Sequence, residues 1–227
     1  MASLGLQTQF YGNPNGANKK TISVTCSPGS NPGLFVVVTM STARNFNNAF
    51  YKNTSGVFIQ MQKMTIRTLV SGSIRQVGYW MPNPPTGVAL DFQVRFNGSQ
   101  NNPIQIYAQS FTGVTQSNLT TEHGYDTSSS PHSKSITIAT NDLICLAGIS
   151  TSTMTSPFVI GGVSAALKVS NKSINGKRLS IAYSGTSLSA GSTVCTTVQG
   201  SSWATVTNVA WVIGNGAGES KRRIIIT

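Results

Sequence analysis

The segment Val88-Ala-Leu-Asp-Phe-Gln-Val-Arg-Phe96 decides the fold class, because apolar and polar side chains alternate along it. One set of alternate positions is apolar throughout: Val88, Leu90, Phe92, Val94 and Phe96. The other set is mainly polar: Ala89, Asp91, Gln93 and Arg95. Successive side chains of a β-strand project to opposite faces of a sheet. We therefore expect a strand here that covers a core with one face and meets water with the other.

The same alternation recurs along the chain, and turn residues separate its occurrences. It is found at residues 63–68, 104–109, 136–138 and 179–183. Continuous apolar runs at Leu34–Thr39 and Leu143–Ile149 indicate central strands, and Trp203–Ile213 is a long mixed run. Turn pairs such as Asn97-Gly98 lie between these segments. No window of helical length carries an apolar stripe with a period of 3.6 residues, so helices are not expected.

These patterns predict an all-β fold: a single antiparallel β-sandwich, jelly-roll-like, with extended N- and C-terminal arms. The length of 227 residues fits one domain. Residues 1–18 are expected to form an arm or a loosely tied first strand, and residues 19–215 the sandwich. Residues 216–227 form a basic tail or a closing strand. The isoleucines that end this tail either complete the protein's own sheet or add to a neighbour's sheet.

The charge balance is strongly basic: 16 Lys and Arg face 5 Asp and Glu, which gives a formal net charge of +11. The net positive charge arises from a scarcity of acidic residues rather than from an abundance of basic ones, since all charged residues together make up only 9% of the chain. The cations are spread along the sequence, which favours attraction to acidic surfaces, including other proteins, over dedicated nucleic-acid binding. No apolar run is long enough to span a membrane. Met1–Asn18 lacks a basic leader followed by an apolar run, so no secretory signal is expected.

Residues that acid–base or metal chemistry requires are scarce. Glu122, His123 and Asp126 lie close together in sequence, but their spacing matches no metal-ligand pattern, so we interpret this stretch as a solvated loop. No Gly-x-Ser-x-Gly motif is followed by Asp and His in workable order. The glycine-rich stretch Gly214–Gly218 opens no helix, as a phosphate-binding loop would. We therefore expect no catalytic residues, no metal and no cofactor.

The chain has three cysteines, Cys26, Cys145 and Cys195, so they cannot all pair within one molecule. Cys145 lies in an apolar run and is expected to be a small buried side chain. Reduced thiols are the default expectation for a protein made in a cytosol. A bridge between Cys26 and Cys195 remains open at this point.

A resemblance to a known family starts at Gly78-Tyr-Trp-Met-Pro-Asn-Pro-Pro-Thr-Gly87. With Val88–Phe96 and the strand end Ser110-Phe-Thr-Gly-Val114, this segment resembles small β-sandwich virion proteins common in tailed-bacteriophage genomes. An opening strand like Leu34–Met40 and a late strand like Ser135–Ile144 occur in the same order, and the resemblance covers about residues 20 to 215. The shared motifs are turn and strand residues and carry no catalytic groups. The resemblance implies a virion component: a capsid decoration or cement protein, or a module of a head or tail fibre.

The function expected from sequence is therefore that of a non-enzymatic virion structural protein, a capsid decoration protein that binds the major capsid protein or other virion proteins. The protein is expected in the virion after synthesis in the bacterial host cytoplasm, and its role by resemblance suggests a homo-oligomer, with a trimer as the first expectation. Nucleic acid and membrane are not expected partners. The candidate partner-binding residues are the cations near the two ends: Lys19, Lys20, Lys221, Arg222 and Arg223.

Two further hypotheses remain open. The first is a lectin-like fibre module, in which exposed Trp80 or Tyr125 stacks on a host glycan. The second is a polysaccharide depolymerase, for which Glu122, His123 and Asp126 are the residues to test.

Overall fold

The computed structural model describes residues 2–41, 46–64, 67–69, 74–117, 119, 122–127, 132–165, 167–174, 176–184, 188–199 and 206–216. Apart from turns and a single 3₁₀ residue, the regular elements in these ranges are all β-strands. No helix among the described residues is long and apolar enough to cross a membrane.

The first half of the chain forms two sheets that pack into a sandwich. The strands in this half are β1 (Ser3–Gly12), β2 (Lys19–Thr25), β3 (Gly33–Ser41), β4 (Phe46–Lys52), β5 (Phe58–Gln60), β6 (Gln62–Lys63), β7 (Arg67–Leu69), β8 (Ile74–Pro82), β9 (Ala89–Phe96) and β10 (Ile104–Thr112). The N-terminal inner sheet has the order β1-β10-β3-β8-β6, with β7 also paired to β8. The N-terminal outer sheet has the order β2-β9-β4-β5.

The second half repeats this arrangement. Its strands are β11 (Glu122–Thr127), β12 (His132–Ile138), β13 (Leu143–Ser150), β14 (Met154–Ile160), β15 (Val163–Ala165), β16 (Leu167–Ile174), β17 (Lys177–Tyr183), β18 (Gly191–Gln199) and β19 (Val206–Ile213). The C-terminal inner sheet has the order β11-β19-β13-β17-β16, and the C-terminal outer sheet has the order β12-β18-β14-β15. Each strand in these two sheets has a counterpart at the same position in the sheets of the first half. The shared strand order is that of a jelly roll. The chain therefore contains two jelly rolls in tandem.

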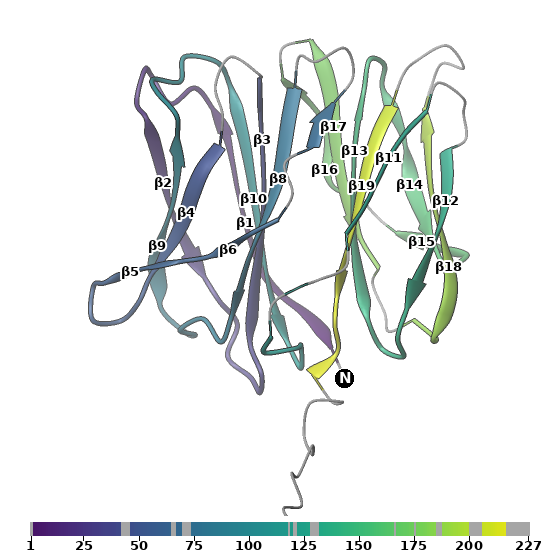
Figure 1. Ribbon diagram of the computed structural model, residues 1–227, viewed down its shortest axis with the longest axis horizontal. Coiled ribbons are helices and arrows are strands. Elements are labelled where there is room, and N and C mark those ends of the chain that lie inside the picture. Colours follow the sequence, from purple (N-terminus) through teal and green to yellow (C-terminus); the bar gives the residue numbers. More distant parts are fainter. Residues whose placement is uncertain are drawn as a thin grey trace, which may run out of the picture.

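The four sheets form four layers with three apolar cores between them (Figure 1). An N-terminal outer core lies between the first two sheets, and a C-terminal outer core lies between the last two. The third core joins the two inner sheets and contains residues of both halves, among them Phe35, Tyr107, Tyr183 and Trp211. The inner sheets are thus buried on both faces, which explains their continuous apolar runs.

The two jelly rolls stand side by side with matching ends together. The ring of Phe35, near the start of β3, lies 5.3 Å from that of Trp211, near the end of β19. The ring of Phe111, near the end of β10, lies 5.7 Å from that of Tyr183, at the end of β17. An approximate two-fold axis parallel to the strands, relating one jelly roll to the other, would bring these matching strand ends together. At one edge, the Tyr11 hydroxyl donates to the carbonyl of Ser173 at 2.5 Å.

The prediction of an all-β, antiparallel, jelly-roll-like fold is confirmed. A single sandwich would have two sheets and one core, whereas the described residues form four sheets and three cores. The sandwiches are small because most strands are only seven to ten residues long, so each half needs little more than a hundred residues. Residues 3–12 form β1, paired to β10. The domain boundaries after residues 18 and 215 stay a prediction, and residues 217–227 lie outside the described residues.

Candidate functional site

Two of the described cations face each other on the N-terminal outer sheet. Lys19 at the start of β2 pairs directly with Arg95 near the end of β9. Both side chains are exposed, and they project from the outer face of the sheet because their neighbours Val94 and Phe96 fill the core. The backbone fixes this corner, since the amide of Phe96 donates to the carbonyl of Asn18 at 2.8 Å.

Arg95 is held in position by its neighbours on the same face. Its Nε donates to Oε1 of Gln93 at 2.9 Å, and Nε2 of Gln93 donates to the hydroxyl of Thr21 at 3.3 Å. The guanidinium carbon lies 4.3 Å from the centre of the Phe50 ring, within the range of a cation–π contact. These contacts engage Nε and one face of the guanidinium group, so its two terminal nitrogens can donate to another partner.

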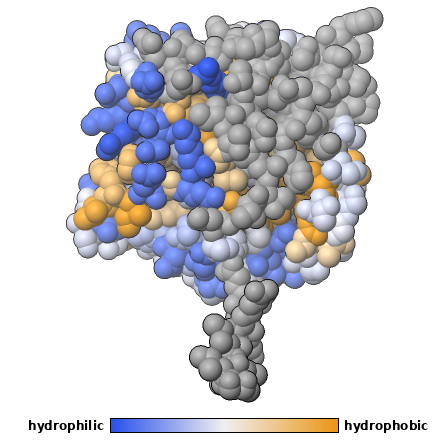
Figure 2. All heavy atoms as spheres, in the orientation of Figure 1, coloured by the Kyte–Doolittle hydropathy of each residue, from blue (hydrophilic) through white to orange (hydrophobic). Residues whose placement is uncertain are grey.

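A pocket of about 270 Å³ opens at this corner and is lined by Asn18, Lys19, Asn47, Arg95 and Phe96. A third cation lies nearby, because Nζ of Lys63 donates to the carbonyl of Phe46, the residue before Asn47, at 2.9 Å. Burial lowers the pKa of Lys63. Figure 2 shows strongly hydrophilic side chains on this side of the molecule, over the layer that holds β2, β4 and β9.

The structure separates the two lysines that the sequence placed together. Successive strand residues face opposite ways, and Nζ of Lys20 lies 3.9 Å from the centre of the Phe10 ring, on the side of β1. Lys19 therefore shares its face with Arg95 rather than with Lys20. Lys221, Arg222 and Arg223 lie outside the described residues. Arg95 was missed as a candidate because its partner strand lies far away in sequence, although its outward position was correctly predicted.

The same sheet carries an ion pair farther along β9. Nζ of Lys52 lies 3.4 Å from a carboxylate oxygen of Asp91, and both side chains are partly exposed. Among the described side chains the other carboxylate is that of Asp142, which is buried in the second jelly roll. The described acids therefore leave the Lys19–Arg95 corner without a carboxylate partner.

The glycan-stacking prediction fails for Trp80. Its side chain is fully buried, its Nε1 donates to the carbonyl of Ser117 at 3.0 Å, and its ring packs against Phe111. A tryptophan in the inner core cannot offer a face to a sugar. Tyr125 lies on β11, where side chains are outside the described part of the structure. The same holds for Glu122, His123 and Asp126, although the stretch that holds them is a strand rather than the predicted loop.

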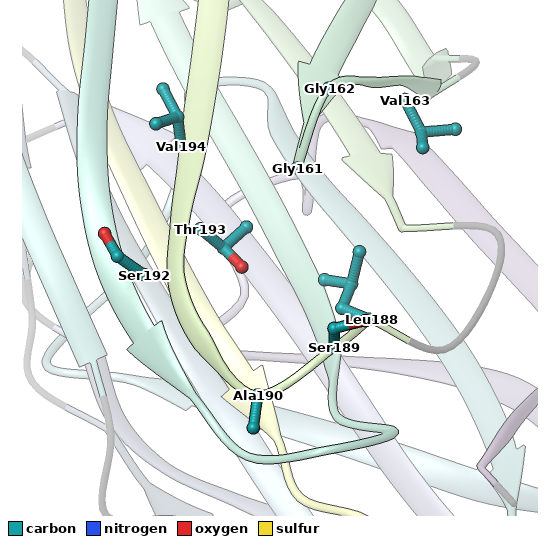
Figure 3. A pocket seen from close by; sticks show the side chains of 9 residues that line it. All are labelled: Gly161, Gly162, Val163, Leu188, Ser189, Ala190, Ser192, Thr193 and Val194. Atoms are coloured by element: carbon teal, nitrogen blue, oxygen red, sulfur yellow. The ribbon is translucent and has the colours of Figure 1, made fainter.

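A pocket of about 560 Å³ lies on the second jelly roll beside the β14–β15 turn and β18 (Figure 3). Its lining consists of glycine, alanine, aliphatic and hydroxyl side chains: Gly161, Gly162, Val163, Leu188, Ser189, Ala190, Ser192, Thr193 and Val194. None of these side chains titrates near neutral pH. General acid–base chemistry by the lining residues is therefore ruled out.

The three thiols are buried and lie in three different cores. Cys26 belongs to the N-terminal outer core, Cys145 to the inner core and Cys195 to the C-terminal outer core. This separation excludes the bridge between Cys26 and Cys195, and none of the three cysteines is in a disulfide. Burial raises the pKa of Cys26 to about 11 and those of Cys145 and Cys195 to about 12, which keeps them protonated at neutral pH. Among the described residues no group of His, Cys, Asp and Glu could hold a metal ion.

No protein-family model and no curated protein sequence match this chain. Among solved structures, the major capsid protein P2 from bacteriophage PM2 is similar over 92% of this chain and 97% of that chain, with 10% sequence identity and a TM-score of 0.29. The turret protein A223 of Sulfolobus turreted icosahedral virus is also similar over 92% of this chain and 97% of that chain, with 14% sequence identity and a TM-score of 0.17. With TM-scores this low, neither likeness supports a conclusion about function. The resemblance to tailed-phage virion proteins stays a prediction.

Proposed function

We propose that the protein is a non-enzymatic structural component of a virus capsid. The observation that carries this proposal is the packing of two jelly rolls of the same topology through one shared core, with their matching ends aligned. Jelly rolls occur in viral capsid proteins and also in lectins, so the fold class alone does not decide between them. The shared core makes the pair one rigid block, as a lattice or lattice-bound protein requires.

The chemistry of the described residues supports a structural role over an enzymatic one. The pocket beside β18 has no lining residue that ionises near neutral pH, and the thiols are buried and protonated at neutral pH. The described carboxylates are engaged: Asp91 with Lys52, and Asp142 with two backbone amides. The Asp142 carboxylate therefore holds the fold together, and the Asp91 carboxylate is paired with a surface cation.

Within the capsid, the role we favour is decoration, in which the protein binds the lattice of a separate major capsid protein. The net charge of +11 suits docking onto an acidic shell, and the exposed Lys19–Arg95 corner presents part of that charge on a rigid sheet. A trimer at a three-fold position of the lattice remains the assembly that we propose.

A second candidate is suggested by the doubled fold. A chain that already contains two jelly rolls side by side could itself tile a shell, with no separate lattice protein beneath it. This candidate predicts that the chain is the most abundant protein of the shell.

Quantitative mass spectrometry of gradient-purified virus particles tests both roles. Decoration predicts many copies per particle together with a second, distinct major capsid protein. A lattice subunit predicts that no other shell protein matches its copy number. A handful of copies per particle would point to a fibre or vertex and reopen the glycan hypothesis, which a glycan array would then examine. Absence from purified particles would overturn the proposal.

A further inference from the structure

The facing pair Lys19 and Arg95 works against stability in the isolated protein. Residues directly opposite on antiparallel strands have Cβ atoms about 5 Å apart, and like charges in such a pair are destabilising. Among the described residues, Asp91 is the carboxylate on the same sheet, and it lies four residues from Arg95 along β9 and is bonded to Lys52. At a rise of about 3.3 Å per residue, that carboxylate is about 13 Å away along the strand. The repulsion therefore has no local compensation in the described part of the chain.

The same corner has the features of a preformed anion site. The pocket brings together an ammonium group, a guanidinium group and the amides of Asn18 and Asn47, all of which can donate hydrogen bonds. Arg95 is already oriented by Gln93 and Phe50, so little side-chain entropy remains to be lost on binding. A guanidinium fork matches the two oxygens of a carboxylate in a bidentate geometry.

We propose that Lys19 and Arg95, assisted by Asn18 and Asn47, bind a carboxylate side chain of an acidic protein partner. The bound carboxylate removes the repulsion between the two cations and pairs with both of them. This inference deepens the proposed function, which supplies the partner: an acidic subunit of the capsid. The site itself does not depend on that role.

A protein carboxylate fits this corner better than a nucleic-acid backbone does. Binding to nucleic acid uses a track of cations that follows successive phosphates. Here the row of outward residues on β9 continues to Asp91, whose negative charge would repel a neighbouring phosphate. A second copy of the chain is also a poor source of the carboxylate, because it carries 5 acids against 16 bases.

The test measures binding of a fluorescein-labelled deca-glutamate peptide to the full-length protein by fluorescence anisotropy, at physiological salt. The double variant Lys19→Gln with Arg95→Gln is expected to weaken binding about tenfold or more, since each factor of ten corresponds to about 1.4 kcal/mol. The control is Lys172→Gln with Arg178→Gln, on β16 and β17, because both side chains are exposed and the net charge changes equally. The control variant is expected to lose less than about threefold, as screened long-range attraction alone predicts.

Equal losses in the two double variants would overturn the proposal, because they would show general attraction to a basic protein. The same assay with single-stranded DNA of matched charge separates the two sources of negative charge. A selective loss of DNA binding in the Lys19→Gln, Arg95→Gln variant, with peptide binding unchanged, would assign the site to phosphate and also overturn it. Peptide binding is measured on the isolated protein, so its outcome is distinct from presence or absence in virus particles.

A melting experiment provides a second readout that needs no peptide. Lys19→Gln is expected to raise Tm at low ionic strength, because it removes the repulsion across the β2–β9 pair. Sodium acetate is expected to raise the Tm of the unmodified protein above its value in sodium chloride of equal ionic strength, and to raise that of Lys19→Gln less. A Tm that falls in Lys19→Gln, or an equal acetate effect in both proteins, would contradict a carboxylate site at this corner.

Discussion

The two jelly rolls share one strand order but fill their outer cores with different side chains. The N-terminal outer core buries five aromatic residues: Phe46, Tyr51, Tyr79, Phe92 and Phe96. The C-terminal outer core is built mainly from Ile, Leu, Ala and Val, with Met154 and Cys195, and Phe158 is its one aromatic member among the described residues. The same topology thus tolerates two very different cores. The alternation of apolar and polar positions specifies the fold, and the choice of apolar residue only adjusts the packing.

The outer faces differ in the same way, and there the difference concerns function. The N-terminal outer sheet presents Lys19, Arg95 and the ion pair of Lys52 with Asp91. The described outward side chains of the C-terminal outer sheet are uncharged, among them Ser133, Ser135, Thr137, Ser192 and Val194. Because both sheets are equally well paired, these charges are not needed for folding. They therefore distinguish the N-terminal outer sheet as the face on which we propose that a partner binds.

The largest predicted effect tests whether the two jelly rolls form one cooperative unit. Trp211 is fully buried in the shared inner core, against Phe35 of the other half. Trp211→Ala is expected to cost about 3–5 kcal/mol, the usual range for a buried large aromatic residue. Because the core is shared, urea unfolding followed by circular dichroism should remain a single transition at a lower midpoint.

The matched control is Val163→Ala, since this side chain is 53% exposed on the second jelly roll. Its expected cost is below about 0.5 kcal/mol. Two separate unfolding transitions in the unmodified protein would contradict a single cooperative unit, because the two jelly rolls would then be independent domains in contact.

The sequence predicted the fold class better than it predicted the number of sandwiches. Leu34–Thr39 and Leu143–Ile149 were correctly interpreted as central strands, and each is buried on both faces. That double burial was the signal for a third core, because a strand in a single sandwich has one face toward water. The signal is weak, since a continuous apolar run shows that both faces are covered but not what covers them.

The candidate site was less predictable, because it depends on pairing across long sequence distances. Lys19 was a candidate as one of two adjacent lysines, and Arg95 was known only to face outward. Their juxtaposition follows from the register of β2 with β9, which no local pattern specifies. Trp80, named for stacking only under the glycan hypothesis, cannot serve there because it lies in the inner core that the two jelly rolls share.

A smaller effect is expected in the loops that precede β3 and β13. These loops occupy corresponding places in the two jelly rolls but are held by different hydrogen bonds. In the first half, the amides of Gly113 and Val114 donate to the carbonyls of Ser30 and Asn31. In the second half, the carboxylate of Asp142 performs this task, accepting from the amides of Ala139 at 2.8 Å and Asn215 at 3.0 Å.

Asp142→Ala should therefore destabilise the protein by about 2–3 kcal/mol, because it leaves two amides without their charged acceptor. Asp142→Asn keeps one acceptor oxygen, so about half of that loss is expected from urea midpoints. A loss below about 0.5 kcal/mol for Asp142→Ala would show that backbone bonds suffice in this half too.

High pH probes the two outer cores with matched reporters, Cys26 and Cys195. Burial raises the pKa of Cys26 to about 11 and that of Cys195 to about 12, from an ordinary value of 9.0. A raised pKa in the folded state means that the stability is fully present below pH 9 and is lost as the pH rises toward 11. Near pH 10, each thiol should account for about 1–1.5 kcal/mol of lost stability.

Cys26→Ala and Cys195→Ala should each flatten the fall of the urea midpoint between about pH 8 and pH 10, by similar amounts. Similar slopes would show that both thiols stay protonated in the folded protein up to about pH 10. A change of slope in one variant alone would mean that the thiol of the other core already ionises in the folded protein, and that this other core admits water.

The smallest effect concerns the charged face itself. Asp91 and Lys52 form an ion pair whose side chains are 43% and 35% exposed, so solvent screens most of their attraction. Asp91→Asn is expected to change stability by less than about 1 kcal/mol, and added salt should reduce even that. The variant leaves the Lys19–Arg95 corner intact while removing the nearest described negative charge on β9. Binding of the deca-glutamate peptide should therefore become slightly tighter although stability is nearly unchanged. Weaker binding in Asp91→Asn would mean that the ion pair is itself part of the contact, and the charged face would then have to be treated as one extended surface rather than as a single corner.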